Sequence, residues 1–131
     1  MKTLHYLLGA RWVSLGWTLM IAVLLCLPGS VLPKEQGFYI PQFDKIVHIT
    51  LFGGFVFLWT YYFSTRGLGG RRLVKIFFYI FLLACAYGTG LEFVQKYFIP
   101  QRYYDEADII ADMVGAGIFY GLANIRLLKF S

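Results

Sequence analysis

Long apolar stretches separated by short polar breaks dominate the hydrophobic pattern of this chain. Four windows are each long and apolar enough for a helix that crosses a bilayer, which takes about 20 residues. The breaks between them carry glycine, proline and charged residues, which end helices. The pattern therefore predicts an all-α, polytopic membrane protein with four transmembrane helices in one bundle. The expected helices cover residues 12–32, 46–65, 73–98 and 106–128.

Composition agrees with a membrane protein. Of the 131 residues, 59% are hydrophobic and only 15% are charged, too few to cover a water-soluble surface. We expect a single domain over residues 1–131, because only short polar breaks separate the windows. The first window lacks a small-x-small cleavage site, so we expect an uncleaved helix. Cys26 and Cys85 lie inside apolar windows, which predicts neither a disulfide nor a cysteine-based zinc site.

Basic residues gather at the ends of the windows. The net charge of +5 is compatible with nucleic-acid binding, but this placement is typical of a topology signal instead, so we expect no nucleic-acid partner. If the N-terminus is cytoplasmic, eight of the 12 basic residues fall on the cytoplasmic side. These eight are Lys2, Arg11, Arg66, Arg71, Arg72, Lys75, Arg126 and Lys129. The excess predicts cytoplasmic termini and places the acidic residues toward the extracytoplasmic end.

Ionisable side chains interrupt the third and fourth windows close to the break at Pro100. Glu92 and Gln95 are three residues apart, and Asp108 and Asp112 are four apart, so each pair lies on one helical face. The short connection makes the two helices antiparallel neighbours. Because charged groups inside a bilayer are costly and usually functional, we expect the two pairs to face each other in one pocket.

The second window is expected to complete this pocket from a third side. Asp44 and His48 share a helical face, and Lys45 lies between them in the sequence. Crowded carboxylates need cationic partners, a metal or protons. Lys45 and Arg102 are the available cations, and a guanidinium suits a carboxylate or a phosphate. A divalent cation is left open: Mg²⁺, Mn²⁺ or Ca²⁺, or Zn²⁺ if His48 ligates. The candidate ligands are Glu92, Asp108, Asp112 and His48.

Structural roles also account for some of these residues. Asp105 can cap the fourth helix, Gln95 can hydrogen-bond between helices, and a lone His48 is more often a packing residue. Glu92 and Asp112 fit a structural role least, because their depth makes burial without a partner costly.

Small and aromatic residues predict contacts of the helices. Gly53 with Gly54, and the pair Gly117-x-x-x-Gly121, allow a neighbouring helix to approach closely. Phe38 and Tyr39 suit an anchor at the level of the lipid headgroups.

The order and spacing of the polar residues resemble one protein family. The pattern consists of Asp44-Lys45-x-x-His48 with Phe52, Glu92-x-x-Gln95, Pro100-x-Arg102, Asp105-x-x-Asp108 and Asp112-x-x-Gly115. It covers about residues 44–121 and resembles the VanZ-like family of small bacterial membrane proteins, which includes a glycopeptide (teicoplanin) resistance protein. The resemblance implies a multi-pass protein of the bacterial cytoplasmic (inner) membrane, associated with the cell envelope or with antibiotic resistance. Members commonly carry Asn where this chain has Asp112.

We interpret the chain as a membrane protein whose outward-facing acidic pocket binds or modifies an envelope lipid or its carbohydrate- or phosphate-bearing headgroup. If it is an enzyme, the acid, base or metal-binding groups are expected among one set of residues. These are Glu92, Asp108, Asp112 and His48. The expected substrate-binding residues are Lys45, Gln95, Arg102, Asp44 and Asp105.

Two other classes of function stay open. In a non-catalytic accessory protein, the same charges hold helices in register and recruit a partner. In an ion- or proton-coupled transporter, four helices without repeats would have to oligomerise to enclose a pathway. An oligomer is also left open for the preferred reading. The sequence contains no nucleophile-elbow, zinc-protease or phosphate-loop motif that would identify a reaction.

Overall fold

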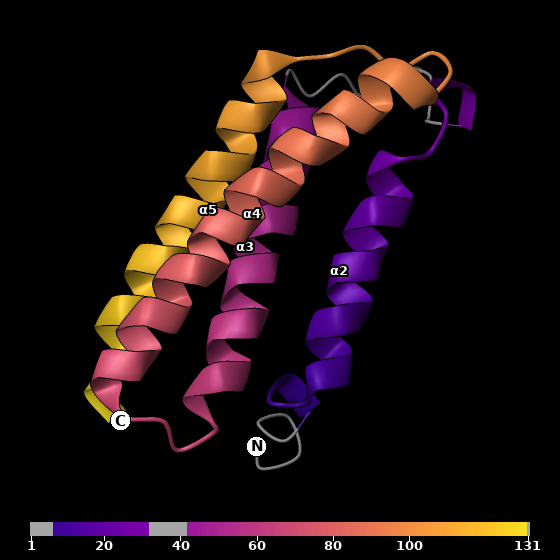
Figure 1. Ribbon diagram of the computed structural model, residues 1–131. Helices are drawn as coiled ribbons and strands as arrows, with labels where there is room; N and C mark the ends of the chain where they lie inside the picture. The colour runs from indigo at the N-terminus through magenta and orange to yellow at the C-terminus, as the bar shows by residue number, and fades with distance from the viewer. Residues whose placement is uncertain (1–6, 32–41, 131) are drawn as a thin grey trace.

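Four long helices and no strand make up the part of the chain that the computed structural model describes, residues 7–31 and 42–130 (Figure 1). The prediction of an all-α bundle is confirmed. Phe38 and Tyr39, the expected headgroup anchors, lie outside the described residues. The helices are α2 (Arg11–Leu25), α3 (Phe43–Ser64), α4 (Gly70–Phe98) and α5 (Glu106–Arg126), with 3-10 turns at Gly29–Val31 and Leu128–Phe130.

The first helix ends earlier than the predicted range of 12–32. It stops at Leu25, because Pro28 lacks an N–H and disfavours a helical residue before it, and the 3-10 turn begins at Gly29. The N–H of Gly29 donates a hydrogen bond to the carbonyl of Pro100 at 3.2 Å. The segment after α2 therefore lies against the α4–α5 loop. The other helix boundaries agree with the predicted ones to within three residues.

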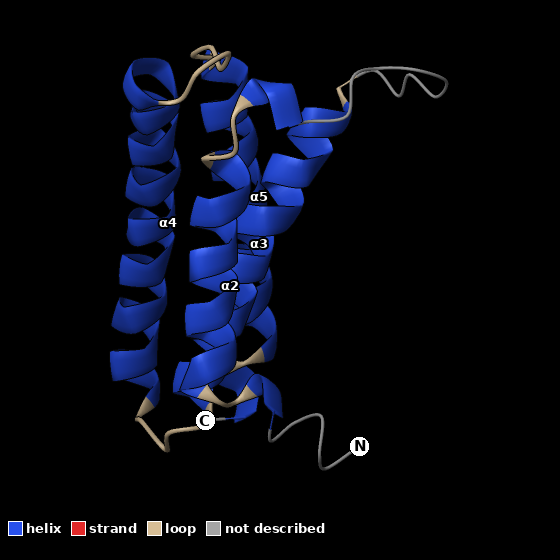
Figure 2. Cartoon of the chain, turned by 90° about the vertical axis from the view of Figure 1, so that its right-hand side faces the viewer, coloured by secondary structure: helices blue, strands red, loops and turns tan. Residues whose placement is uncertain are grey.

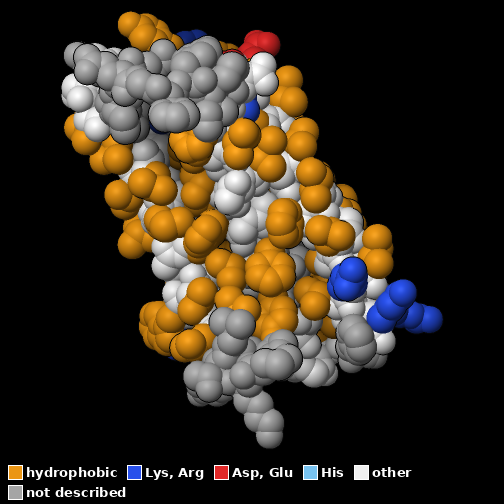
Figure 3. Space-filling view, turned by 180° about the vertical axis from the view of Figure 1, so that it is seen from behind, with side chains coloured by type: hydrophobic (Ala, Val, Ile, Leu, Met, Phe, Trp, Pro, Cys, Tyr) orange, Lys and Arg blue, Asp and Glu red, His pale blue; other side chains and the backbone are white. Residues whose placement is uncertain are grey.

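The distribution of side chains is that of a protein surrounded by lipid. Helices α3, α4 and α5 are long and apolar enough to cross a membrane, while α2 has 15 residues and is shorter. Large apolar side chains such as Leu83 and Ile118 are more than half exposed, whereas Glu92 and Asp112 are fully buried. Hydrophobic side chains cover the middle of the face in Figure 3. A polar interior with an apolar exterior suits a bilayer.

Helix α3 lies at the centre of the bundle and contacts the other three helices. The closest approach is to α5, where a Cβ on Gly115 would meet the backbone of Ile49. By contrast, a Cβ on Gly121 would meet nothing within 4 Å, and one on Gly117 would make only an ordinary contact. The prediction of a close contact at Gly117 and Gly121 was therefore wrong, because these two glycines do not lie on the side of α5 that faces α3.

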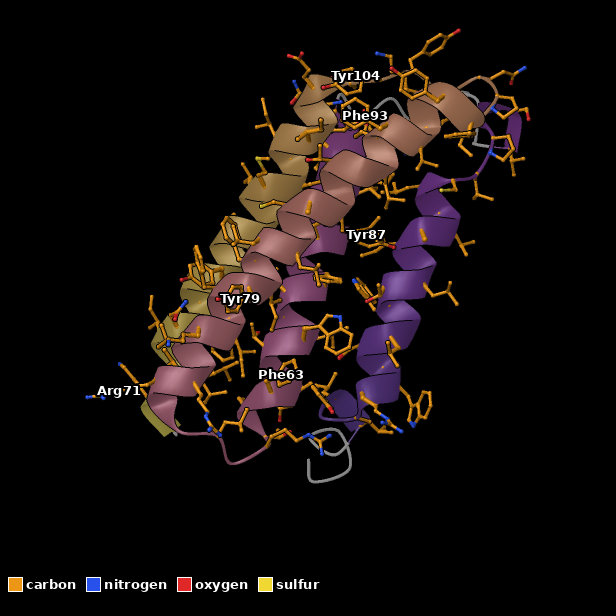
Figure 4. All side chains as sticks on the ribbon, viewed as in Figure 1. Phe63, Arg71, Tyr79, Tyr87, Phe93 and Tyr104 are labelled. Carbon is orange, nitrogen blue, oxygen red and sulfur yellow. The ribbon has the colours of Figure 1, made fainter. Side chains whose placement is uncertain are left out.

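Polar contacts fasten α2 to the bundle. The indole N–H of Trp17 donates to the Leu51 carbonyl at 2.9 Å, and the Tyr87 hydroxyl donates to the Thr18 carbonyl at 2.7 Å. Figure 4 shows Tyr87 extending from α4 toward α2. Gly54 leaves room for the Trp17 ring, which a Cβ there would strike. These contacts hold the middle of α2 against α3 and α4.

Candidate functional site

The chain brings its ionisable residues together at one end of the bundle, where α3 and α5 begin and α4 ends. This is the end that carries the α4–α5 loop, opposite the α3–α4 turn (Figures 1 and 2). The residues come from the first two turns of α3, from the N-cap and first two turns of α5, and from the last two turns of α4, so three short stretches suffice to build the cluster. We call the following seven residues the polar cluster: Asp44, Lys45, His48, Glu92, Asp105, Asp108 and Asp112.

Lys45 lies among three carboxylates. Its ammonium nitrogen is 2.9 Å from Asp44 Oδ2, 2.6 Å from Asp105 Oδ2 and 2.6 Å from Asp108 Oδ1. These three hydrogen bonds use every donor of the ammonium group. Asp105 lies outside the membrane-spanning helices, and the hydrogen bond from Lys45 holds its pKa below the ordinary value. Lys45 thus links the start of α3 to the start of α5.

His48 lies between two carboxylates of α5. Its Nδ1 is 2.7 Å from Asp112 Oδ1, within hydrogen-bond distance, and its Nε2 is 3.7 Å from Asp108 Oδ2, beyond it. An ionised Asp112 can only accept a hydrogen bond, and in that state the hydrogen of His48 lies on Nδ1. The other ring nitrogen then faces Asp108.

Glu92 and Asp112 are buried to 0% and 1% exposure. Glu92 Oε2 accepts a long hydrogen bond from the backbone N–H of Asp105 at 3.4 Å. Glu92 Oε1 and Asp112 Oδ2 have no hydrogen-bond partner among the described residues. Gly88 provides the space for Asp112, because a Cβ there would collide with the carboxylate. Leaving a buried polar atom without a partner costs about 1–3 kcal/mol, so these two oxygens are the acceptors of the cluster that are open to a further group.

The side chains of Gln95 and Arg102 contact the end of α2 and not the polar cluster. Gln95 Nε2 donates to the Leu25 carbonyl at 2.8 Å, and Arg102 Nη2 donates to the same oxygen at 3.3 Å. Both side chains thus satisfy the C-terminal end of α2, whose last carbonyls have no partner within the helix. Among the described residues, Arg102 forms no ion pair with a carboxylate. Asp105 accepts a hydrogen bond from the N–H of Ala107 at 2.8 Å and so also caps α5.

Two features of the site were not found from the sequence. The role of Gly88 in seating Asp112 has a signal in retrospect, because Gly88 is four residues before Glu92 and shares its helical face. The hydrogen bonds of Gln95 and Arg102 to the Leu25 carbonyl have no signal in the sequence, because every residue has a backbone carbonyl.

Two groups of side chains have the spacing of metal ligands. Ligand atoms of His48, Glu92 and Asp108 all lie within 4.8 Å of one another, as do those of Asp44, Asp105 and Asp108. In the second group the ammonium of Lys45 already supplies the positive charge.

A cavity of about 510 Å³ lies near the opposite, basic end of the bundle, lined in part by Arg11, Tyr62 and Arg66. None of the polar cluster lines it. We place the candidate site at the polar cluster and not at this cavity. Burying carboxylates inside a membrane protein costs free energy, and such residues usually have a function.

Fold and cluster together define a small helical membrane protein with a cluster of acidic side chains at one end of its bundle. The sequence profile of the VanZ/LLP1 family matches residues 8–128. The chain therefore belongs to the VanZ/LLP1 family, and the resemblance found from its sequence is confirmed. No curated protein and no solved structure matches it.

Proposed function

We propose that the polar cluster binds the headgroup of an envelope lipid. The observation that carries this proposal is the pair of buried acceptor oxygens without partners, on Glu92 and Asp112. Glu92 lies six residues before the end of α4, about 9 Å from it at the helical rise. A headgroup at the interface would lie within this distance of Glu92, with its acyl chains against the apolar helix surfaces.

The charges of the cluster favour a headgroup rich in hydrogen-bond donors. It holds five carboxyl groups and one lysine, and Lys45 has no donor left for a phosphate. Carbohydrate hydroxyl groups can donate to the open acceptors of Glu92 and Asp112. Of the two headgroup types considered from the sequence, the carbohydrate-bearing one therefore fits better.

The proposal includes a place in the cell. We place the protein in the bacterial cytoplasmic membrane with both termini inside, on the excess of basic residues at the Arg11, Arg66 and Arg126 end. The polar cluster then faces the extracytoplasmic side, where envelope lipids carry sugars. As the family resemblance implies, the protein would act there in resistance to glycopeptide antibiotics such as teicoplanin.

The test is lipid retention. The protein is extracted in polymer-bounded membrane discs, and its lipids are compared with the bulk membrane by mass spectrometry. We expect a glycosylated lipid to be enriched with the wild type and with Glu106→Gln, a matched change at an exposed position of the same end. Enrichment should be lost with Glu92→Gln. A wild-type lipid profile equal to that of the bulk membrane would refute the proposal.

One observation favours a second candidate, a non-catalytic accessory protein. Lys45 joins α3 to α5 through Asp105 and Asp108, which is what a cluster that only holds helices in register would do. On that account every charge-removing change in the cluster destabilises the fold, and no lipid is selected.

A further inference from the structure

We propose that His48, Glu92 and Asp108 bind one divalent transition-metal ion, and that Asp112 orients the histidine. This ion would lie in the same cluster that we propose binds a lipid headgroup. Only the role of the ion rests on that proposed function. Metal binding itself is a property of the protein without lipid.

The geometry fits a single ion held by three helices. His48 comes from α3, Glu92 from α4 and Asp108 from α5, and their ligand atoms lie within 4.8 Å of one another. Nitrogen and oxygen ligands bind Zn²⁺ at about 2.0–2.2 Å, so two ligands of one ion are at most about 4.4 Å apart. The His48 Nε2 and Asp108 Oδ2 atoms, 3.7 Å apart, already meet this limit. Any pair close to the 4.8 Å bound would have to move closer by a few tenths of an ångström when the ion binds.

Asp112 holds His48 as a metal-binding histidine is usually held. In most such sites the ring nitrogen that does not ligate donates its hydrogen to a carboxylate or a carbonyl, which fixes the tautomer. Here Asp112 Oδ1 lies 2.7 Å from Nδ1. The lone pair of Nε2 is then directed toward Asp108, where the ion would lie.

Glu92 gives the second, independent observation. Its side chain is completely buried, and its Oε1 has no hydrogen-bond partner among the described residues. Asp108 also has an oxygen that could bind the ion. Lys45 donates to its Oδ1, and its Oδ2 lies on the side of His48. A dication would supply the partner of Glu92 and balance the carboxylates that Lys45 does not reach.

The donor set narrows the choice of ion. One imidazole with two carboxylates suits Zn²⁺ or Mn²⁺, whereas Mg²⁺ and Ca²⁺ prefer oxygen ligands alone. Three protein ligands leave a coordination position open, as in catalytic rather than structural zinc sites. That position could take a water or a headgroup hydroxyl.

The experiment uses the full chain in detergent, stripped with a chelator and titrated with Zn²⁺ or Mn²⁺ alone against a chromophoric competitor. We expect one ion per chain and no displacement by equimolar Mg²⁺. Glu92→Gln and Asp108→Asn should each weaken binding at least about tenfold. Glu106→Gln, and His5→Gln at the other histidine of the sequence, should leave the affinity unchanged.

Asp112 separates orientation from charge. Asparagine still accepts the hydrogen of Nδ1 and alanine does not, so Asp112→Ala should weaken binding about 10–100-fold and Asp112→Asn clearly less. Circular dichroism and gel-filtration elution check that each variant is folded. Thermal unfolding of the wild type with and without metal gives a readout that needs no variant, and the ion should raise the midpoint.

Two results would overturn the inference: wild-type binding no stronger than that of the Glu92→Gln, Asp108→Asn double variant, or an unchanged midpoint with saturating Zn²⁺ and Mn²⁺. The outcomes for lipid are separate. Lipid enrichment that survives chelator treatment, without metal binding, refutes the ion and keeps the proposed function. Metal binding without lipid enrichment supports the ion site and refutes the proposed function.

Discussion

Lys45 and His48 pair with different carboxylates of the polar cluster. Lys45 bonds Asp44, Asp105 and Asp108, and His48 bonds Asp112. Glu92 alone receives only a long backbone hydrogen bond. At the scale of single residues, then, every carboxylate of the cluster except Glu92 has a cationic or histidine partner. This difference makes Glu92 the residue whose substitution separates function from stability.

Lys45→Met tests whether the ion pairs of Lys45 stabilise the fold. The change leaves three carboxylates without their shared cation, and breaking a buried ion pair costs about 3–5 kcal/mol; with 20% of the Lys45 side chain exposed, we expect the lower end. Thermal unfolding in detergent measures it. Lys96→Met is the control, because Lys96 is exposed and forms no ion pair among the described residues. Equal midpoints for the two variants would show that the Lys45 bonds contribute little.

At the scale of the helices, α3 determines where the site forms. Gly53 and Gly115 let α3 and α5 approach until a Cβ on either would strike the other helix. This close crossing brings the first turns of α3 and α5 together, and with them Lys45 and Asp108. The rings of Phe93 in α4 and Tyr104 in the following loop pack at the same end in a tilted arrangement, with centroids 5.7 Å apart (Figure 4).

Gly115→Ala should therefore destabilise the protein. The added methyl group meets the backbone of Ile49, which has little freedom to move, and overpacking of this kind costs about 1–3 kcal/mol. Gly121→Ala is the matched control: its Cβ enters open space, and removing a helical glycine gains about 0.5–1 kcal/mol. Thermal unfolding of both variants is the measurement. A Gly115→Ala midpoint at or above that of Gly121→Ala would contradict the close crossing.

The helices were predictable from sequence, whereas their contacts were only partly so. Hydrophobic windows placed α3, α4 and α5 to within three residues, because the length of an apolar stretch is a local property. The spacing of Glu92, Asp108 and Asp112 also indicated which faces turn inward. The rotation of α5 that puts Gly115 rather than Gly117 against α3 depends on packing between helices. So does the bond from Gln95 to a backbone carbonyl, which no side-chain pattern encodes.

At the scale of the whole molecule, the two ends of the bundle differ in charge. The polar cluster lies at the end with the α4–α5 loop, and Arg66, Arg71 and Arg126 lie at the other; Figure 4 shows Arg71 pointing away from the bundle there. Since basic residues stay on the cytoplasmic side, this difference predicts how the protein lies in its membrane.

Cysteine labelling measures that orientation. In a chain whose Cys26 and Cys85 are replaced by alanine, Tyr103→Cys in the loop around Gln101 and Gly69→Cys in the α3–α4 turn place single thiols at opposite ends. Both positions are exposed. We expect a membrane-impermeant reagent to modify Tyr103→Cys in whole cells and Gly69→Cys only after lysis. The opposite pattern would turn the polar cluster toward the cytoplasm.

The central claim is that Glu92 serves function rather than folding, and Glu92→Gln tests it most directly when stability and lipid retention are measured on the same preparation. Glutamine keeps the volume and removes a buried charge that costs free energy. On metal-free protein we predict an unfolding midpoint equal to or above that of the wild type and a loss of the enriched lipid, whereas Glu106→Gln should keep the wild-type midpoint and the lipid. A Glu92→Gln protein that loses stability and still enriches the lipid, or loses both together, would contradict the claim and make Glu92 a structural residue.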